Sequence, residues 1–282
     1  MSTQKKSLTL AIAVYNAVQY LEFLLTALQR QSFVDFEVIV ADDGSGPEIG
    51  KTVERMQPLL PMPILHLWQP DAGFRKNAML NKAIAASQTD YLLFIDGDCV
   101  PHREFIRDHV SHRQAGGILC GRRVNFSKSI TERLTIEDVR SGRLERLSFQ
   151  VLWDGLMARS SNLEDAMRIE SELIRRLIPR NNPRILGCNF SVEKRLLEKI
   201  NGFNEDYQAP GLGEDSDLAY RLGLVGARFV SLRYLAILYH LYHPATQIGE
   251  ANRKLYERLL TQRNPVCPNG LVKLQDYRSP VS

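Results

Sequence analysis

Short apolar runs alternate with stretches of helical periodicity along the first hundred residues. Four runs rich in branched and aromatic residues predict buried strands, at 8–14, 36–41, 64–68 and 91–95. Between them, apolar residues recur at three- and four-residue steps and predict helices, at 18–28, 47–56 and 73–86. This alternation predicts an α/β fold with a Rossmann-like, mostly parallel sheet flanked by helices on both faces.

The pattern changes in the second half of the chain. Segment 121–184 is rich in Arg and Glu, and its amphipathic stretches at 144–157 and 163–178 predict a helical insertion outside the main sheet. The later elements that the pattern predicts are helices at 191–200, 217–225 and 252–260 and a strand at 229–239. We therefore expect one domain over residues 1–282, interrupted by this insertion.

Composition narrows the choice of partners. The 282 residues are 44% hydrophobic, which is enough to bury a sizeable core. Lys and Arg number 36 against 32 Asp and Glu, a formal net charge of +4. Such a weakly basic balance gives no reason to expect nucleic-acid binding, and it suits anionic small substrates or a negative membrane surface.

Cysteine spacing and hydropathy bear on the compartment. The four cysteines form no CxxC pair, which predicts free thiols in a reducing environment. Residues 1–6 are polar and lack an apolar signal core. The most apolar stretch, 229–242, contains Arg233 and His240 and falls short of the ~18 residues of a membrane span. We expect a cytoplasmic protein that at most contacts the inner face of the cell membrane peripherally.

Two acidic motifs follow predicted strands. Asp42 and Asp43 come after the second strand, and Asp96 and Asp98 come after the fourth. Ligands of parallel α/β sheets bind beyond the carboxyl ends of the strands, where both motifs are expected. Two carboxylates one residue apart can bind a hard cation whose shell phosphate oxygens complete. Taken singly, each motif also fits a plain turn.

Two further groups of residues are candidates for catalysis or metal binding. Glu214 and Asp215 precede a predicted helix, where a carboxylate can act as a general base or only cap the helix. His240 and His243 follow the last apolar run. Imidazole is a common metal ligand, but paired histidines also occur simply packed at surfaces.

These motifs occur in an order that resembles one family. They are Asp-Asp-Gly-Ser at 42–45, Asp-Ala-Gly-Phe-Arg at 71–75, Ile-Asp-Gly-Asp at 95–98, Gly-Cys-Asn at 187–189, Gly-Glu-Asp at 213–215 and Tyr-His-Leu-Tyr-His at 239–243. The order is similar to family 2 glycosyltransferases of the GT-A fold. The second half resembles the galactosyltransferase type shared with chondroitin-polymerase domains. The resemblance covers about 8–110 and 185–250 and leaves 121–184 unexplained.

The resemblance implies a role for each candidate residue. It implies donor binding by Asp42 or Asp43, Arg75 and Asp96; metal binding by Asp98 and His240, with Asp96 in the metal shell or on the ribose; base catalysis by Asp215; and acceptor binding by Glu214 and Asn189. The implied cofactor is a divalent cation, Mn²⁺ or Mg²⁺. Segment 1–110 becomes the nucleotide-binding half, 185–250 the acceptor and catalytic half, and 251–282 a tail.

The implied activity is an inverting transfer of a hexose or N-acetylhexosamine from a UDP-sugar to a hydroxyl of a saccharide or glycolipid. Surface polysaccharide or lipopolysaccharide biosynthesis is the expected context. Two alternatives stay open. A non-catalytic nucleotide-sugar sensor could use the same fold, because fold alone does not fix function. A nucleotidyltransferase typically has a Gly-rich phosphate loop near the first strand, and residues 13–16 contain no glycine.

Overall fold

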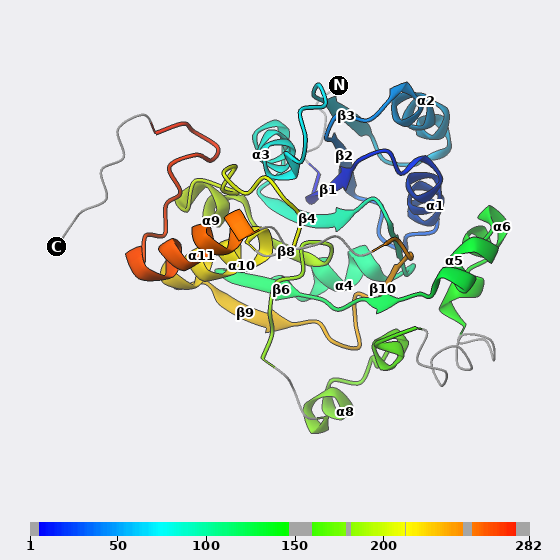
Figure 1. Ribbon diagram of the computed structural model, residues 1–282. Helices are drawn as coiled ribbons and strands as arrows, with labels where there is room; N and C mark the ends of the chain where they lie inside the picture. Colours follow the sequence, from blue (N-terminus) through cyan, green and yellow to red (C-terminus); the bar gives the residue numbers. More distant parts are fainter. Residues whose placement is uncertain (1–5, 147–159, 179–181, 212, 245–249, 275–282) are drawn as a thin grey trace.

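A seven-stranded sheet forms the centre of the computed structural model, which describes residues 6–146, 160–178, 182–211, 213–244 and 250–274 (Figure 1). In spatial order its strands are β3 (Ile64–Trp68), β2 (Phe36–Asp42), β1 (Leu8–Val14), β4 (Tyr91–Asp96), β8 (Phe190–Glu193), β6 (Gly117–Cys120) and β9 (Arg228–Ser231). Only β8 runs against its neighbours, so the predicted mostly parallel sheet is confirmed.

Helices cover both faces of this sheet, as the alternation predicted. One face carries α1 (Val18–Leu28), α2 (Pro47–Met56) with the short η1 (Gln57–Leu59), and α4 (Phe105–Ser111). The other face carries α3 (Lys76–Ala86), α9 (Lys194–Lys199) and α10 (Glu214–Leu224). Each layer buries its own apolar cluster, with Leu24 and Val53 in the first and Met79, Leu197 and Leu222 in the second.

Strand register places the two acidic motifs side by side. Val14 of β1 pairs with Asp42, and Ala13 pairs with Asp96 on the opposite side of β1. The Gly97 amide donates to the Ala13 carbonyl at 2.7 Å, and a Cβ on Gly97 would lie only 3.1 Å from the same oxygen. A residue without a side chain therefore fits best at this close approach. Both motifs lie at one edge of the sheet, as predicted.

The second half departs from the predicted elements in two places. The predicted helix 191–200 begins as strand β8, where the buried hydroxyl of Ser191 bonds to Tyr91 and His109 inside the sheet. The predicted strand 229–239 is two strands, β9 and β10 (Leu238–His240), in different sheets. Left-handed backbone at Tyr234 and Ala236 separates them, because the chain must turn from one sheet to the other.

The described parts of segment 121–184 are only partly helical. Its elements are β7 (Val124–Asn125), α5 (Lys128–Arg133), α6 (Ile136–Arg140), η2 (Arg143–Glu145), η3 (Leu163–Ala166) and α8 (Glu172–Leu177). Strand β7 joins β10 and β5 (Cys99–Pro101) in a three-stranded sheet, so the described strand of this segment lies outside the seven-stranded sheet. The predicted amphipathic stretch 144–157 falls mostly outside the described residues.

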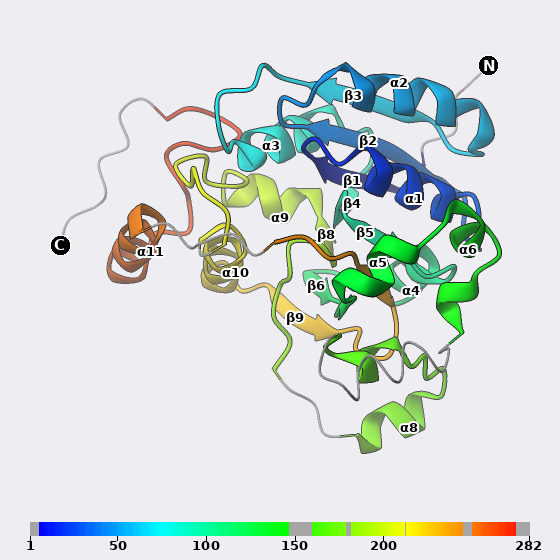
Figure 2. The same cartoon turned by 45° about the vertical axis from the view of Figure 1, so that its right-hand side comes forward.

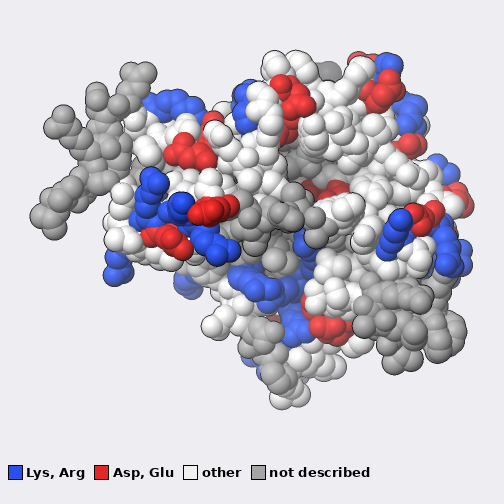
Figure 3. All heavy atoms as spheres, in the orientation of Figure 1, with Lys and Arg blue, Asp and Glu red and all other residues white. Residues whose placement is uncertain are grey.

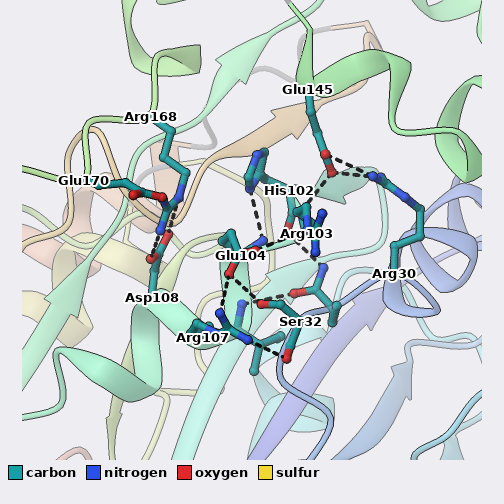
Figure 4. A network of polar contacts seen from close by, with 12 residues as sticks. Arg30, Ser32, His102, Arg103, Glu104, Arg107, Asp108, Glu145, Arg168 and Glu170 are labelled. Carbon is teal, nitrogen blue, oxygen red and sulfur yellow. Dashed lines mark hydrogen bonds and ion pairs between the residues drawn. The ribbon is translucent and has the colours of Figure 1, made fainter.

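A polar network fastens this segment to the body of the protein (Figure 4). Arg30, in the turn after α1, makes a bidentate contact with Glu145, at 2.8 and 3.0 Å. Arg168 lies 2.6 Å from Asp108 of α4, and Asp108 also accepts the Ala236 amide at 2.9 Å. Asp108 is buried, so its negative charge needs these donors. The segment is thereby tied to helices on the α1 face of the sheet.

The remaining described elements are peripheral. Helix α11 (Glu250–Gln262) packs beside α10. All four cysteines are buried free thiols, as predicted. Among the described residues, no helix is both long enough and apolar enough to span a bilayer.

Candidate functional site

A cleft of about 720 Å³ opens at the carboxyl edge of the parallel strands. Its walls come from the ends of β1, β2 and β4, the starts of α3 and α10, the loop 186–188, and the two histidines at and just after the end of β10. Figure 3 shows the hollow near the middle of one face, with acidic atoms inside it and basic atoms below it. The two halves of the sequence thus contribute to one site.

Asp98, His240 and His243 form a compact group on the cleft wall. Asp98 Oδ2 lies 3.5 Å from His240 Nε2 and 3.2 Å from His243 Nε2, and the two nitrogens are 3.3 Å apart. Two ligands each about 2.1 Å from one ion are about 3.0–3.5 Å apart at angles near 90–110°. These three side chains therefore fit a divalent cation, and they are the described residues whose ligand atoms cluster in this way.

Pairing in the small sheet creates this group. His240 of β10 lies opposite Cys99 of β5, and the Leu241 amide donates to the Asp98 carbonyl at 2.9 Å. His243 Nδ1 lies 3.0 Å from the Pro244 carbonyl oxygen, which favours a proton on Nδ1, so Nε2 is the nitrogen that would bind an ion after releasing the proton it shares with Asp98. His240 was among the predicted metal ligands, and His243 was not.

Contacts between Asp98 and the two histidines stabilise the charged forms of Asp98 and His243. Burial alone would raise the pKa of Asp98, but hydrogen bonds and positive charge from His240 and His243 hold it well below its usual value. The hydrogen bond with Asp98 raises the pKa of His243. The carboxylate is therefore ionised at neutral pH, as a metal ligand must be.

Asp215 lies in the first turn of α10 and lines the same cleft as the group of Asp98, His240 and His243. Its Oδ2 accepts the Gly187 amide at 2.8 Å, and a Cβ on Gly187 would lie 2.5 Å from its Oδ1. Burial, followed by the negative charge of Glu214, raises the pKa of Asp215 to about 7, against the opposing effect of Lys76. A carboxylate with such a pKa is a stronger base than an exposed aspartate and is suited to accept a proton near neutral pH.

Lys76 forms ion pairs with Asp96 after β4 and with Glu214 of α10. It was not among the residues that the sequence predicted for the site. Its ammonium lies 2.8 Å from Asp96 and 3.1 Å from Glu214. Burial opposes its charge, but Asp96, Glu214 and Asp215 together hold the pKa of Lys76 well above its usual value. Glu214 Oε2 is buried and has no partner among the described residues, so it is available to a ligand hydroxyl.

The predicted donor residues separate into two kinds. Asp43 lines the cleft, whereas Asp42 is fully buried and binds the Ser45 amide at 2.8 Å and His66 at 3.0 Å. Asp42 therefore shapes the turn. Arg75 holds Asp43 through its backbone amide at 2.7 Å, but its guanidinium bonds to the Pro70 carbonyl and is not part of the cleft wall. Asp96 faces Lys76, and its predicted place in the metal shell stays a prediction.

Asn189, predicted to bind the acceptor, lies behind the cleft. Its side chain is fully buried and donates to the carbonyls of Arg122 and Ala236, at 2.6 and 2.9 Å. His109 lies 3.0 Å from its Oδ1. These bonds use both amide hydrogens, so Asn189 holds the loop 186–188 in place and does not face an acceptor.

Comparison with known families agrees with this geometry. The model of "Glycosyl transferase family 2" matches residues 9–200. A second model, "N-terminal domain of galactosyltransferase", matches residues 173–244. Both matches include residues that line the cleft, the first through Asp98 and the second through Asp215 and His243.

Similar proteins are sugar-polymer synthases and nucleotide-sugar complexes. Chondroitin synthase of Escherichia coli is 26% identical over 92% of this chain and 38% of its own length. Chondroitin synthase of Pasteurella multocida is 22% identical over 95% of this chain and 28% of its own length. The chain thus spans well under half of these relatives. TarS of S. aureus with UDP-GlcNAc has a TM-score of 0.58 at 17% identity, covering 90% of this chain and 66% of its own. The mannosyltransferase PcManGT of Pyrobaculum calidifontis with GDP-Man and Mn²⁺ has a TM-score of 0.54 at 16% identity, covering 99% and 67%.

Proposed function

We propose that this chain, which belongs to glycosyltransferase family 2, is an inverting, metal-dependent hexosyltransferase that uses a UDP-sugar donor. One observation carries the proposal: the carboxylate–imidazole group of Asp98, His240 and His243 shares a single cleft with the basic carboxylate of Asp215. The first group suits a diphosphate-bound cation, and the second suits a hydroxyl about to lose its proton.

Each of these residues of the cleft has a separate role in the proposed reaction. Asp215 accepts the proton of the acceptor hydroxyl as the new bond to the anomeric carbon forms. Asp98, His240 and His243 would hold a divalent ion, which when bound supplies positive charge that offsets the charge on the departing diphosphate. Asp43 binds the nucleoside, and the free oxygen of Glu214 accepts from a sugar hydroxyl.

The charge pairing of the other carboxylates supports the proposed inversion. A retaining double displacement needs a free nucleophile on the opposite face of the sugar. Asp96 and Glu214 share the ammonium of Lys76, and Asp43 accepts the Arg75 amide and a Gln69 hydrogen bond at 2.6 Å. Both oxygens of Asp43 thus accept a hydrogen bond, whereas Asp215 has a pKa raised to about 7, forms no salt bridge and accepts only the Gly187 amide, which supports a single displacement with Asp215 as the base.

Substrate class is proposed from the relatives. TarS binds UDP-GlcNAc, and the chondroitin synthases are polymer-forming enzymes by name, which supports a hexose or N-acetylhexosamine donor and a saccharide or glycolipid acceptor. We place the reaction in surface polysaccharide or lipopolysaccharide biosynthesis, at the cytoplasmic face of the membrane.

A screen of nucleotide-sugars tests this function. With Mn²⁺ or Mg²⁺ present, we expect UDP release from one UDP-hexose or UDP-N-acetylhexosamine, and none after addition of a chelator. The product linkage, determined by NMR with the matching acceptor, should have the anomeric configuration opposite to that of the donor. A protein that binds UDP-sugars tightly but never releases UDP with any acceptor is a sensor, and the enzymatic proposal would then be wrong.

Helix α8 is our candidate for the membrane contact. Leu173 and Leu177 are 74% and 84% exposed, and Ile174 beside them is 52% exposed. The helix lies at the bottom of Figures 1 and 2, away from the large sheet. Residues 168–184 contain five Arg and two Glu, so basic charge accompanies these apolar side chains. This combination suits an anionic lipid surface.

We expect the protein to pellet with anionic phospholipid vesicles and to do so less as salt rises. Leu177→Ser should weaken this binding about tenfold, because it removes one leucine from the lipid contact. Leu59→Ser is the matched control, since Leu59 is 60% exposed in η1. Equal weakening by both variants would argue against α8, and salt-independent pelleting would argue against charge attraction.

A further inference from the structure

Arg123 lies on the cleft wall without a role in the site described above. It immediately precedes β7 and is one of the residues that line the cleft. Its guanidinium donates to Cys188 Sγ at 3.7 Å, a weak acceptor, next to Gly187. The pKa of His243 is raised by its bond with Asp98, and the charge of Arg123 acts against that rise. Arg123 therefore stands between the metal-ligand group and the loop that holds Asp215.

Arg123 is a cation of the cleft wall without an ion-pair partner among the described residues, and the negative charge of Asp96 acts on it only from beyond salt-bridge distance. The described cleft wall carries five carboxylates, from Asp43, Asp96, Asp98, Glu214 and Asp215, and two cations, from Lys76 and Arg123. Lys76 is already engaged by Asp96 and Glu214. No carboxylate of the described residues lies within salt-bridge distance of Arg123, although its side chain is largely withdrawn from solvent.

Removing a guanidinium from water is costly unless an anion compensates it. An anion that arrives with the ligand would provide that compensation. The donor of the proposed reaction carries a diphosphate, which must enter a cleft dominated by carboxylates. A guanidinium can bind phosphate oxygens in a bidentate manner, which an ammonium cannot match.

We infer that Arg123 forms an anion subsite that binds the diphosphate of the nucleotide donor beside Asp98, His240 and His243. The inference rests on the proposed use of a nucleotide-sugar. The same guanidinium could instead meet a carboxylate or phosphate of the acceptor, and the two sources of the anion are separable by experiment.

The test is calorimetric binding of UDP and of uridine, each with Mn²⁺, to the wild type and to Arg123→Gln. We expect Arg123→Gln to weaken UDP binding about 10- to 100-fold, the range for a hydrogen bond between charged groups, and to leave uridine binding unchanged. Arg123→Lys should fall between the two. Arg122→Gln is the matched control: it removes the same charge next to Arg123, and Arg122 is not part of the cleft wall.

Other outcomes would overturn the inference. Unchanged UDP affinity in Arg123→Gln excludes the diphosphate, and a raised KM for the acceptor in that variant would assign the anion to the acceptor. Equal loss of UDP and uridine binding, or a loss that Arg122→Gln shares, would indicate a structural effect. A wild type that binds no UDP with Mn²⁺ would contradict the proposed function itself and the diphosphate subsite with it.

Discussion

Replacing Asp215 with asparagine is expected to lower turnover at least about 10²–10⁴-fold while UDP still binds, because the variant loses the proton acceptor. Asparagine keeps the shape of the side chain, and its oxygen can still accept the Gly187 amide. Product formation and UDP affinity are measured on the same preparation. Asp217→Asn is not a useful control, since Asp217 forms a buried pair with Arg221. A variant with wild-type turnover would exclude Asp215 as the base.

The pH dependence provides a second test of the same residue. Burial and Glu214 raise the pKa of Asp215 to about 7, and only the ionised form accepts a proton. We expect kcat/KM of the wild type to fall as the pH drops below about 7 and to level off above it. The residual activity of Asp215→Asn should not show this decrease below pH 7. A wild-type profile flat from pH 5 to 8 would contradict the role.

The free energy of unfolding should depend on pH in the opposite direction: it should decrease as the pH rises, whereas activity increases. The pKa of Asp215 is higher in the folded state than its ordinary value of 3.8, so the folded state binds the proton that the unfolded state has released. The folded protein is therefore penalised progressively as the pH rises from about 4 to 7. Asp215→Asn lacks this penalty, and its melting temperature relative to the wild type should increase over that range.

The part of the cleft at the ends of β2 and β4 could be predicted from sequence because it depends on local pattern. Apolar runs fixed the ends of β2 and β4, and parallel strands bring those ends to one edge. The position of Asp43 and Asp96 follows from that geometry without any side-chain detail. Helix α10 was also predicted, although it begins at Glu214, earlier than expected, so both acidic residues belong to its first turn.

The rest of the site depends on contacts between distant segments. His243 joins the group only because β10 pairs with β5, and the apolar run 229–239 concealed the turn between β9 and β10. In the sequence Lys76 is an ordinary first residue of a helix, and only the fold brings Glu214 at the start of α10 within 3.1 Å of it. Arg123 is one of many arginines in segment 121–184, and only the fold singles it out. The spacing of apolar residues along the chain contains no information about such contacts between distant segments.

Removing divalent cations is expected to abolish transfer, and restoring Mn²⁺ or Mg²⁺ should recover it. Asp98→Asn and His243→Ala should each weaken Mn²⁺ binding by at least about tenfold, measured directly by electron paramagnetic resonance. His112→Ala is the matched control, because the imidazole of His112 bonds to the Asp108 carbonyl outside the cleft. Full activity in a cation-free preparation would exclude the metal.

Proton competition should accompany this metal binding. Contact with Asp98 raises the pKa of His243, so without metal this imidazole holds its proton to a higher pH than an ordinary histidine. A metal ligand must release that proton, and Mn²⁺ affinity is expected to fall as the pH decreases through the pKa of His243. His243→Ala should bind Mn²⁺ more weakly and with a shallower pH dependence. If the variant kept the wild-type affinity and slope, Asp98 and His240 would hold the ion without His243.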